Sequence, residues 1–217
     1  METISKARAH GGTQGVYKHD AKTTGCPMTF AVFVPPQAEN GPVPVLWYLS
    51  GLTCTHANVM DKGEYRKAAA EHGVIIVAPD TSPRGAKVAG ESDSWDFGVG
   101  AGFYLDATQT PWAPHWRMES YLIDELLPLL GAQFPIDPQR IGLFGHSMGG
   151  HLALRAVVEG AVDPDALILV APMLGLRLPT GALLGAGIIG LMNALGRAER
   201  GIWEAKQGPG HHTRQRN

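Results

Sequence analysis

The chain has 217 residues, of which 44% are hydrophobic, and this is compatible with one domain built around one substantial core. A formal net charge of −2, with no block of like charges, excludes the strong electrostatic field that nucleic acid or acidic lipid would require, so we expect a small substrate. Residues 1–8 lack the apolar core of a signal peptide, and Cys26 and Cys54 are expected to be free thiols in the reducing cytoplasm.

The predicted strands fall into two groups. Residues 13–19 and 28–34 flank a polar connector and predict an antiparallel pair at the edge of a sheet. Continuous apolar runs follow later, and such runs are typical of parallel strands buried on both faces. These runs are residues 45–49, 74–78, 141–144 and 167–170.

Helical periodicity occupies the segments between these runs. Residues 57–72 predict a helix that ends at Gly73, a residue type favoured directly after helices. A second helix is predicted to stop before Pro135, with one face lined by Met118, Leu122, Leu126 and Leu129. The alternation predicts an α/β fold, with a mostly parallel sheet and helices on both faces.

Residues 80–114 show neither period and are rich in glycine, aspartate and aromatic residues. Long loops inside a compact domain are usually functional. The aromatic residues fit two interpretations, which are the wall of an acyl or thiol pocket and packing that holds the loop down. They are Trp95, Phe97, Phe103, Tyr104 and Trp112.

Ser147 lies at the centre of Gly-His-Ser-Met-Gly, residues 145–149, between the predicted strand 141–144 and a helical segment over about residues 148–159. Strand, sharp turn and helix around G-x-S-x-G form a nucleophile elbow. The two glycines leave room for a strained turn that lifts the serine hydroxyl above the sheet. The N–H of Met148 then points at a developing oxyanion. The motif therefore predicts acyl-transfer chemistry with Ser147 as the covalent nucleophile.

Longer motifs surround the elbow, at residues 49–55, 78–85, 96–108 and 145–151. Through these motifs, residues 11–151 closely resemble the S-formylglutathione hydrolases, the esterase-D-like branch of the α/β-hydrolases. The resemblance implies that Ser147 is the nucleophile and that the backbone N–H groups of Leu52 and Met148 form the oxyanion hole. It also implies cleavage of the thioester S-formylglutathione to glutathione and formate, without a metal or organic cofactor.

The position of Leu52 agrees with that role, because it follows a strand end and a glycine at the carboxyl edge of the predicted sheet. Cys54, two residues further on, is expected close to the site. It fits either a modifiable site thiol or a small buried hydrophobic residue.

Beyond the elbow the pattern changes. Residues 152–197 look more like the lysophospholipase or monoacylglycerol-lipase type of α/β-hydrolase, in which such a segment leads into a lid. Residues 178–196 carry no charge and are expected to be a lid or packing helix rather than a membrane span. We expect one α/β-hydrolase domain at residues 1–200, incomplete at its C-terminal end, and a flexible tail at residues 201–217.

The acid and histidine of a catalytic triad are not identifiable. In α/β-hydrolases they follow the nucleophile in the order serine, acid, histidine. No aspartate follows the strand at 167–170, and the acids that precede or follow it are Asp163, Asp165, Glu199 and Glu204. The first two are expected at the wrong end of the sheet.

The candidate histidines are equally weak. His211 and His212 lie in a polar, glycine-flanked tail, and the resemblance gives neither His146 nor His151 the role of base. Three functions stay open: an S-formylglutathione hydrolase, a carboxylesterase or lysophospholipase-like hydrolase, and a catalytically incomplete domain that acts only in binding. A homo-oligomer is also left open.

Overall fold

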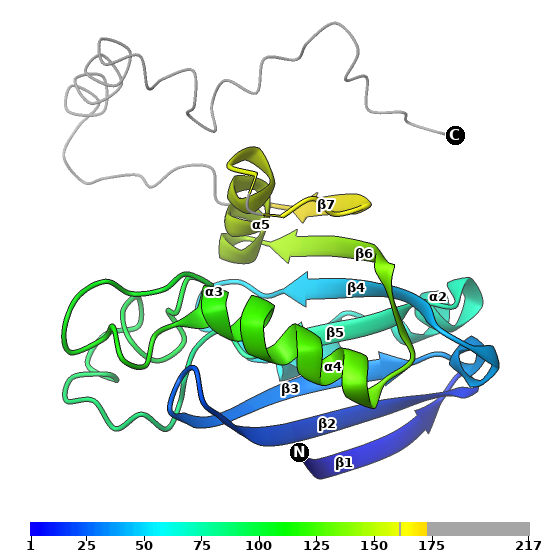
Figure 1. The fold of residues 1–217 in the computed structure, drawn as a ribbon, viewed down its shortest axis with the longest axis horizontal. Helices are drawn as coiled ribbons and strands as arrows, with labels where there is room; N and C mark the ends of the chain where they lie inside the picture. Colours follow the sequence, from blue (N-terminus) through cyan, green and yellow to red (C-terminus); the bar gives the residue numbers. More distant parts are fainter. Residues whose placement is uncertain (161, 173–217) are drawn as a thin grey trace, which may run out of the picture. The chain divides into compact units, whose positions relative to one another are not determined.

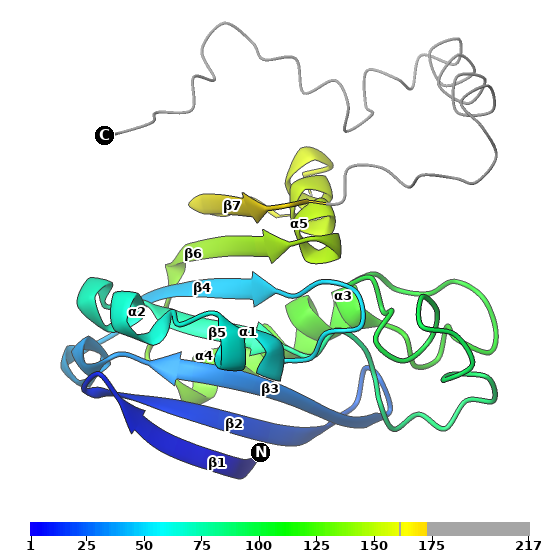
Figure 2. The ribbon, with the colours of Figure 1, turned by 180° about the vertical axis from the view of Figure 1, so that it is seen from behind.

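The computed structural model describes residues 1–160 and 162–172. Within them, seven strands form one sheet in the order β1-β2-β3-β5-β4-β6-β7 (Figures 1 and 2). The strands are β1 (Glu2–Ala9), β2 (Gly12–Ala21), β3 (Cys26–Val34), β4 (Val43–Leu49), β5 (Ile75–Pro79), β6 (Ile136–His146) and β7 (Ala166–Val170). Neighbours are antiparallel from β1 to β5 and parallel from β5 to β7.

Helices cover both faces of this sheet. In Figure 1 the front face carries α3 (Met118–Ser120), the π-helical segment η2 (Tyr121–Leu126) and α4 (Leu127–Gln133). In Figure 2 the opposite face carries α1 (Ala57–Lys62) and α2 (Arg66–His72). Helix α5 (Met148–Val158) packs on β6 and β7, and a short 3-10 turn, η1 (Pro36–Asn40), leads into β4. The predicted α/β fold with a parallel core is confirmed.

The apolar runs form the parallel strands because both faces of those strands are covered. Every residue of β5 is buried, and β4 alternates buried and half-buried residues. Val32, Val45 and Val77 are almost completely buried at the centre of the sheet. The carboxyl ends of β4, β5 and β6 therefore sit on a rigid support, and the loops that follow them meet at one edge.

The predicted antiparallel pair is present as β2 and β3, but it does not form the edge of the sheet. Strand β1 pairs antiparallel with β2 and lies outside it. Its residues are exposed except for the last, which is half-buried. A strand with no buried face leaves no alternation of apolar and polar residues, so periodicity could not reveal it.

The predicted helix 57–72 is broken into α1 and α2. Gly63 caps α1, and Glu64 adopts a left-handed conformation with φ of 45°, which interrupts the helical path. The predicted end is confirmed, because Gly73 is left-handed with φ of 66° and its N–H bonds to Ala69 O.

The second predicted helix exists, but its buried face differs from the predicted one. Met118 and Leu126 are fully buried as expected, whereas Leu129 is only half-buried and Leu130 is fully buried. The π-helical turn η2 explains the change, since a π turn holds more residues than an α turn and shifts everything after it around the axis.

Residues 80–117, the region of the predicted loop, contain only isolated bridges and turns. Packing holds part of this loop in place. The Trp112 ring meets Phe97 and Trp116 edge to face at 4.7 and 4.8 Å, and Trp116 Nε1–H donates to Gly98 O at 2.9 Å. Trp95, by contrast, is 69% exposed. For Trp112 the packing interpretation is therefore the better one.

Several predicted features lie outside the described residues. These are the lid or packing helix at 178–196, the tail at 201–217, and Glu199, Glu204, His211 and His212. Among the helices that the structure describes, none combines the length and the hydropathy needed to cross a bilayer.

Candidate active site

Ser147 occupies the sharp turn between β6 and α5. Its φ of 54° and ψ of −117° lie outside the regions that non-glycine residues usually adopt. The backbone is fixed on both sides of the turn, because Ser147 N–H donates to Val170 O at 3.0 Å and Ser147 O accepts from His151 N–H at 3.1 Å. The strand, strained serine and helix have the geometry of a nucleophile elbow.

The glycines of the motif let the start of α5 approach the sheet. A β-carbon on Gly145 would lie 2.4 Å from Gly150 Cα, and one on Gly149 would lie 2.1 Å from Leu49 O. Both contacts are with backbone atoms, which cannot rotate away. Any larger residue at either position would push α5 off β6 and β4 and would move Ser147 with it.

The loop that follows β4, residues 50–55, lies against Ser147. A β-carbon built on Gly51 would be 3.0 Å from Ser147 Cβ, so Leu52 lies next to the elbow. Met148 is fully buried and is the first residue of α5, where a backbone N–H has no acceptor within the helix. Among the described residues, neither the Leu52 N–H nor the Met148 N–H donates to another backbone group.

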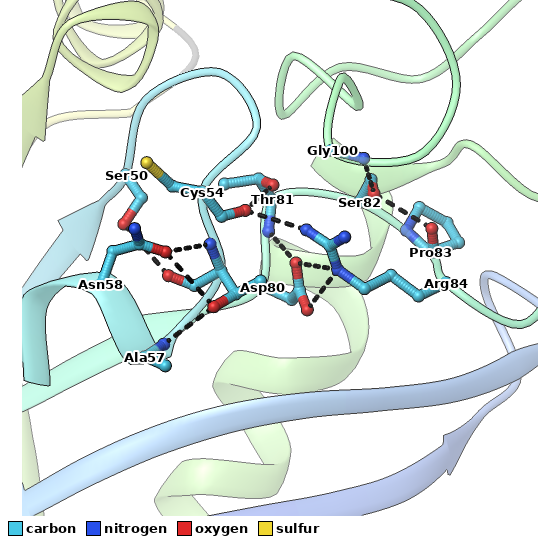
Figure 3. Close-up of polar contacts among 11 residues, drawn as sticks. Ser50, Cys54, Ala57, Asn58, Asp80, Thr81, Ser82, Pro83, Arg84 and Gly100 are labelled. Atoms are coloured by element: carbon cyan, nitrogen blue, oxygen red, sulfur yellow. Dashed lines mark hydrogen bonds and ion pairs between the residues drawn. The ribbon is translucent and has the colours of Figure 1, made fainter. Parts of the chain in front are cut away.

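Cys54 is half-buried in the same loop and its thiol is free. Its backbone makes most of its contacts. Cys54 N–H donates to Gly51 O at 3.3 Å, and Cys54 O accepts from Thr81 Oγ1 and from Arg84 Nη2, the latter at 2.9 Å (Figure 3). Arg84 Nε in turn bonds to both carboxylate oxygens of Asp80, at 3.0 and 2.9 Å.

The far end of loop 50–55 is tied to α1 (Figure 3). Thr55 N–H donates to Asn58 Oδ1 at 2.8 Å, and Ala57 N–H donates to Thr55 Oγ1 at 3.1 Å. The second bond satisfies the N–H of the first residue of α1, which has no acceptor within the helix. The loop therefore leaves β4 and enters α1 with both of its ends fixed.

Sequence reasoning did not assign roles to Asp80, Thr81 or Arg84. The available signal was the motif at residues 78–85, which contains all three and contributed to the family resemblance. The sequence did not show that the partner of Thr81 and Arg84 is the carbonyl of Cys54. The bonds from Thr81 and Arg84 reach a carbonyl group about thirty residues away, and any residue type carries a carbonyl.

No histidine among the described residues is hydrogen-bonded to Ser147 Oγ. The histidine rings that form hydrogen bonds there are His19, to Tyr121 Oη at 3.0 Å, and His115, to Thr24 O at 2.8 Å. Nδ1 of His56 and Nδ1 of His151 are buried and find no partner within residues 1–160 and 162–172. Burial lowers the pKa of His56 and so favours the neutral ring, whereas the charge of Asp80 acts in the opposite direction.

Asp165 lies at the amino end of β7, as the sequence predicted. Its Oδ2 accepts from Ile141 N–H at 2.8 Å, and its own N–H donates to Ile141 O at 2.8 Å. Ser147 lies at the opposite end of the sheet, after the carboxyl end of β6. Asp165 thus joins two strands and is not placed to orient a base.

An apolar groove of about 350 Å³ runs over β4 and β6 between α4 and α5. It is lined by Trp47, Leu49, Leu127, Leu143, Leu152 and Ala156, among others. None of the elbow residues 145–149 and none of residues 50–55 lines it. The groove is therefore distinct from the surface around Ser147.

These features define a serine hydrolase elbow on an α/β-hydrolase sheet. The profile of the Esterase family matches residues 21–208, and the chain belongs to this family. The matched range extends past the elbow and includes residues 152–197.

Within this family, the chain is similar to S-formylglutathione hydrolases. It is 55% identical to the mouse protein over 173 residues, which cover 80% of this chain and 61% of that one. The Paracoccus denitrificans protein is 56% identical over 153 residues, 70% of this chain and 54% of that one. The solved structure of an S-formylglutathione hydrolase from Agrobacterium tumefaciens superposes with a TM-score of 0.77 at 51% identity, covering 81% of this chain and 63% of that one. The chain thus spans less than two thirds of the length of each.

Proposed function

We propose that this chain is a serine thioesterase that acts on S-formylglutathione. The observation that carries the proposal is the strained Ser147 at the elbow, with the Leu52 loop against it. The similarity to S-formylglutathione hydrolases supports the choice of substrate. Ser147 is the proposed nucleophile, and the N–H groups of Leu52 and Met148 are the proposed oxyanion hole.

In the proposed reaction, Ser147 Oγ attacks the formyl carbon and a base takes its proton. The carbonyl oxygen becomes an oxyanion that accepts hydrogen bonds from the two amides. Collapse of this intermediate breaks the carbon–sulfur bond and releases glutathione as a thiolate. Because a thiol has a pKa of roughly 8.5, the leaving group needs little help from an acid. Water then attacks the formyl-serine and releases formate, and this step again requires a base.

The described residues do not identify that base, since no histidine there is hydrogen-bonded to Ser147 Oγ. An oxyanion hole without a working triad still accelerates such reactions by about 10³ to 10⁴ over water. We therefore propose that the 217-residue chain is a weak catalyst by itself. Its two free thiols and weak net charge suit the reducing cytoplasm and a small thioester substrate.

Labelling with a fluorophosphonate, followed by mass spectrometry of the adduct, tests the nucleophile. We expect modification of Ser147, loss of labelling in Ser147→Ala, and normal labelling in Ser5→Ala, which removes an exposed serine of β1. Labelling elsewhere with Ser147 untouched would overturn the assignment.

A comparison of substrates tests the specificity. The ratio kcat/KM for S-formylglutathione is expected to exceed that for a short activated ester and for a monoacylglycerol. A preference for the monoacylglycerol or a lysophospholipid would move the assignment to a lipase-like esterase. No difference between wild type and Ser147→Ala on any substrate would favour a domain that only binds.

A further inference from the structure

Loop 50–55 is held at three points that flank Leu52 on both sides. Before Leu52, Ser50 O accepts from Tyr104 Oη–H at 3.2 Å. After Leu52, Thr53 N–H donates to Gly100 O at 2.9 Å, and Cys54 O accepts from Thr81 and Arg84. Each contact comes from the segment between β5 and α3. That segment therefore positions the backbone of a loop to which it is not adjacent in sequence.

The loop needs such support because its backbone is unusual. Thr53 has φ of 66°, a left-handed conformation that a β-branched residue rarely adopts. The neighbouring peptide planes can turn over at little cost unless their carbonyl and amide groups are bonded. The plane between Gly51 and Leu52 is held by the bond from Cys54 N–H to Gly51 O, so its orientation depends on the position of Cys54. If this plane turned over, a carbonyl oxygen would take the place of the Leu52 N–H.

Arg84 is the charged donor among these contacts, and Asp80 orients it. The Asp80 side chain is 6% exposed and the Arg84 side chain 33%. Asp80 follows β5 directly, and its Oδ1 also accepts from Thr81 N–H at 2.7 Å, so the carboxylate is fixed. The guanidinium of Arg84 donates from Nε to both carboxylate oxygens of Asp80, and this fixes its plane so that Nη2 donates to Cys54 O (Figure 3).

We infer that Asp80 and Arg84 form a positioning pair that keeps the Leu52 N–H directed at the oxyanion beside Ser147. Thr81 assists by donating to the same carbonyl of Cys54. The pair touches no reacting atom and acts only through the backbone of loop 50–55. This inference rests on the proposed function, because it assigns the pair to the oxyanion hole of that reaction.

Steady-state kinetics on S-formylglutathione test the pair in the full chain. The rate of the Ser147→Ala variant gives the background, which is subtracted from the rate of each protein. Arg84→Ala is expected to lower kcat by on the order of 10-fold or more and to change KM less than about 2-fold, because removal of a whole oxyanion donor costs about 10² to 10³ in kcat. Addition of free guanidinium ion at millimolar concentration should restore part of the lost kcat. The Arg84→Lys variant should have a kcat below that of wild type, since an ammonium group cannot bond to Asp80 and to Cys54 O in the same plane.

Arg140→Ala is the matched control. It breaks an arginine–aspartate pair of 2.6 Å with Asp137 near the start of β6, far from loop 50–55 in the sequence and at the other end of the sheet. Its kcat and KM should equal those of wild type. Thr81→Val removes the second donor to Cys54 O without disturbing the ion pair, and it gives the answer if Arg84→Ala does not fold.

The outcomes separate the two proposals. A folded Arg84→Ala with wild-type kcat, or with a raised KM and unchanged kcat, would overturn the positioning role. If neither Thr81→Val nor guanidinium changes kcat, the result counts against it in the same way. If Ser147→Ala is as active as wild type, the proposed function itself fails, whatever the Arg84 variants do.

Discussion

Alanine at Gly149 and alanine at Gly131 should change the stability of the protein in opposite directions. Both glycines lie in helices, Gly149 in α5 and Gly131 in α4, and neither has a positive φ. Each substitution gains about 0.5 to 1 kcal/mol from the lower backbone entropy of alanine in the unfolded chain. Nothing lies within 4 Å of a β-carbon at Gly131, so that gain should appear in full.

At Gly149 the same β-carbon would lie 2.1 Å from Leu49 O and 2.7 Å from Ser50 O. Overpacking of this kind costs about 1 to 3 kcal/mol, and contact with two consecutive backbone carbonyls places the cost at the upper end. The two variants should therefore differ by about 3 kcal/mol. For a chain of this size that corresponds to a difference in Tm of roughly 6 to 12 °C.

Urea denaturation of both variants, with the slope m compared with that of wild type, measures the effect. Gly149→Ala should also lose fluorophosphonate labelling at Ser147, because α5 carries the elbow. A Gly149→Ala protein as stable as Gly131→Ala would refute the claim that close approach of α5 to β4 requires this glycine.

Three further outcomes are expected. Burial lowers the pKa of His19, against the opposing charge of Glu125. As the pH falls below about 6.5, His19 takes up a proton more readily in the unfolded chain than in the folded one. The contribution of neutral His19 to stability is therefore complete above that pH and is lost below it. The urea midpoint should fall more between pH 7.5 and 5.5 for wild type than for His19→Gln, and equal falls would contradict the assignment. Among the described strands β7 has one neighbour, and its Ile168 is 44% exposed, so this edge of the sheet can pair with another chain. Ile168→Lys should therefore reduce self-association measured by sedimentation velocity. Identical sedimentation of the two proteins would count against association through this edge. Turnover of S-formylglutathione should stay below the usual enzyme range of about 1 to 10³ per second, and a value inside that range, abolished by His211→Ala/His212→Ala, would show that the tail supplies the base.

The parts of the fold that the sequence predicted are those with a local cause. The parallel strands are continuous apolar runs because both of their faces are buried. The elbow is recognisable because Gly145 and Gly149 must lack side chains for α5 to reach the sheet. Gly73 marks a helix end through its own left-handed φ of 66°. Each of these signals resides in the residue that carries the structure.

The parts that were missed depend on partners elsewhere. Gly63 was a local sign of the break between α1 and α2, but Glu64, which is left-handed although it is not a glycine, gave none. The π turn that moved Leu130 into the core in place of Leu129 is a feature of hydrogen bonding and not of residue type. The bond from Arg84 to Cys54 O joins a side chain to a backbone group, which no residue pattern specifies.

The loop from residue 80 to residue 117 is expected to open at a lower free energy than the sheet. It contributes no strand to the sheet, and the bond from Gly100 N–H to Ser82 Oγ, 2.7 Å long, closes its first half upon itself. Segments with few ladder hydrogen bonds open at a free energy below that of the whole domain. Since the same segment holds Thr53 through Gly100 O, each such opening releases the loop beside Ser147. Reactivity of the serine would then be lost at lower urea concentration than the tertiary structure, and hydrogen exchange of the Thr53 amide would report the opening directly.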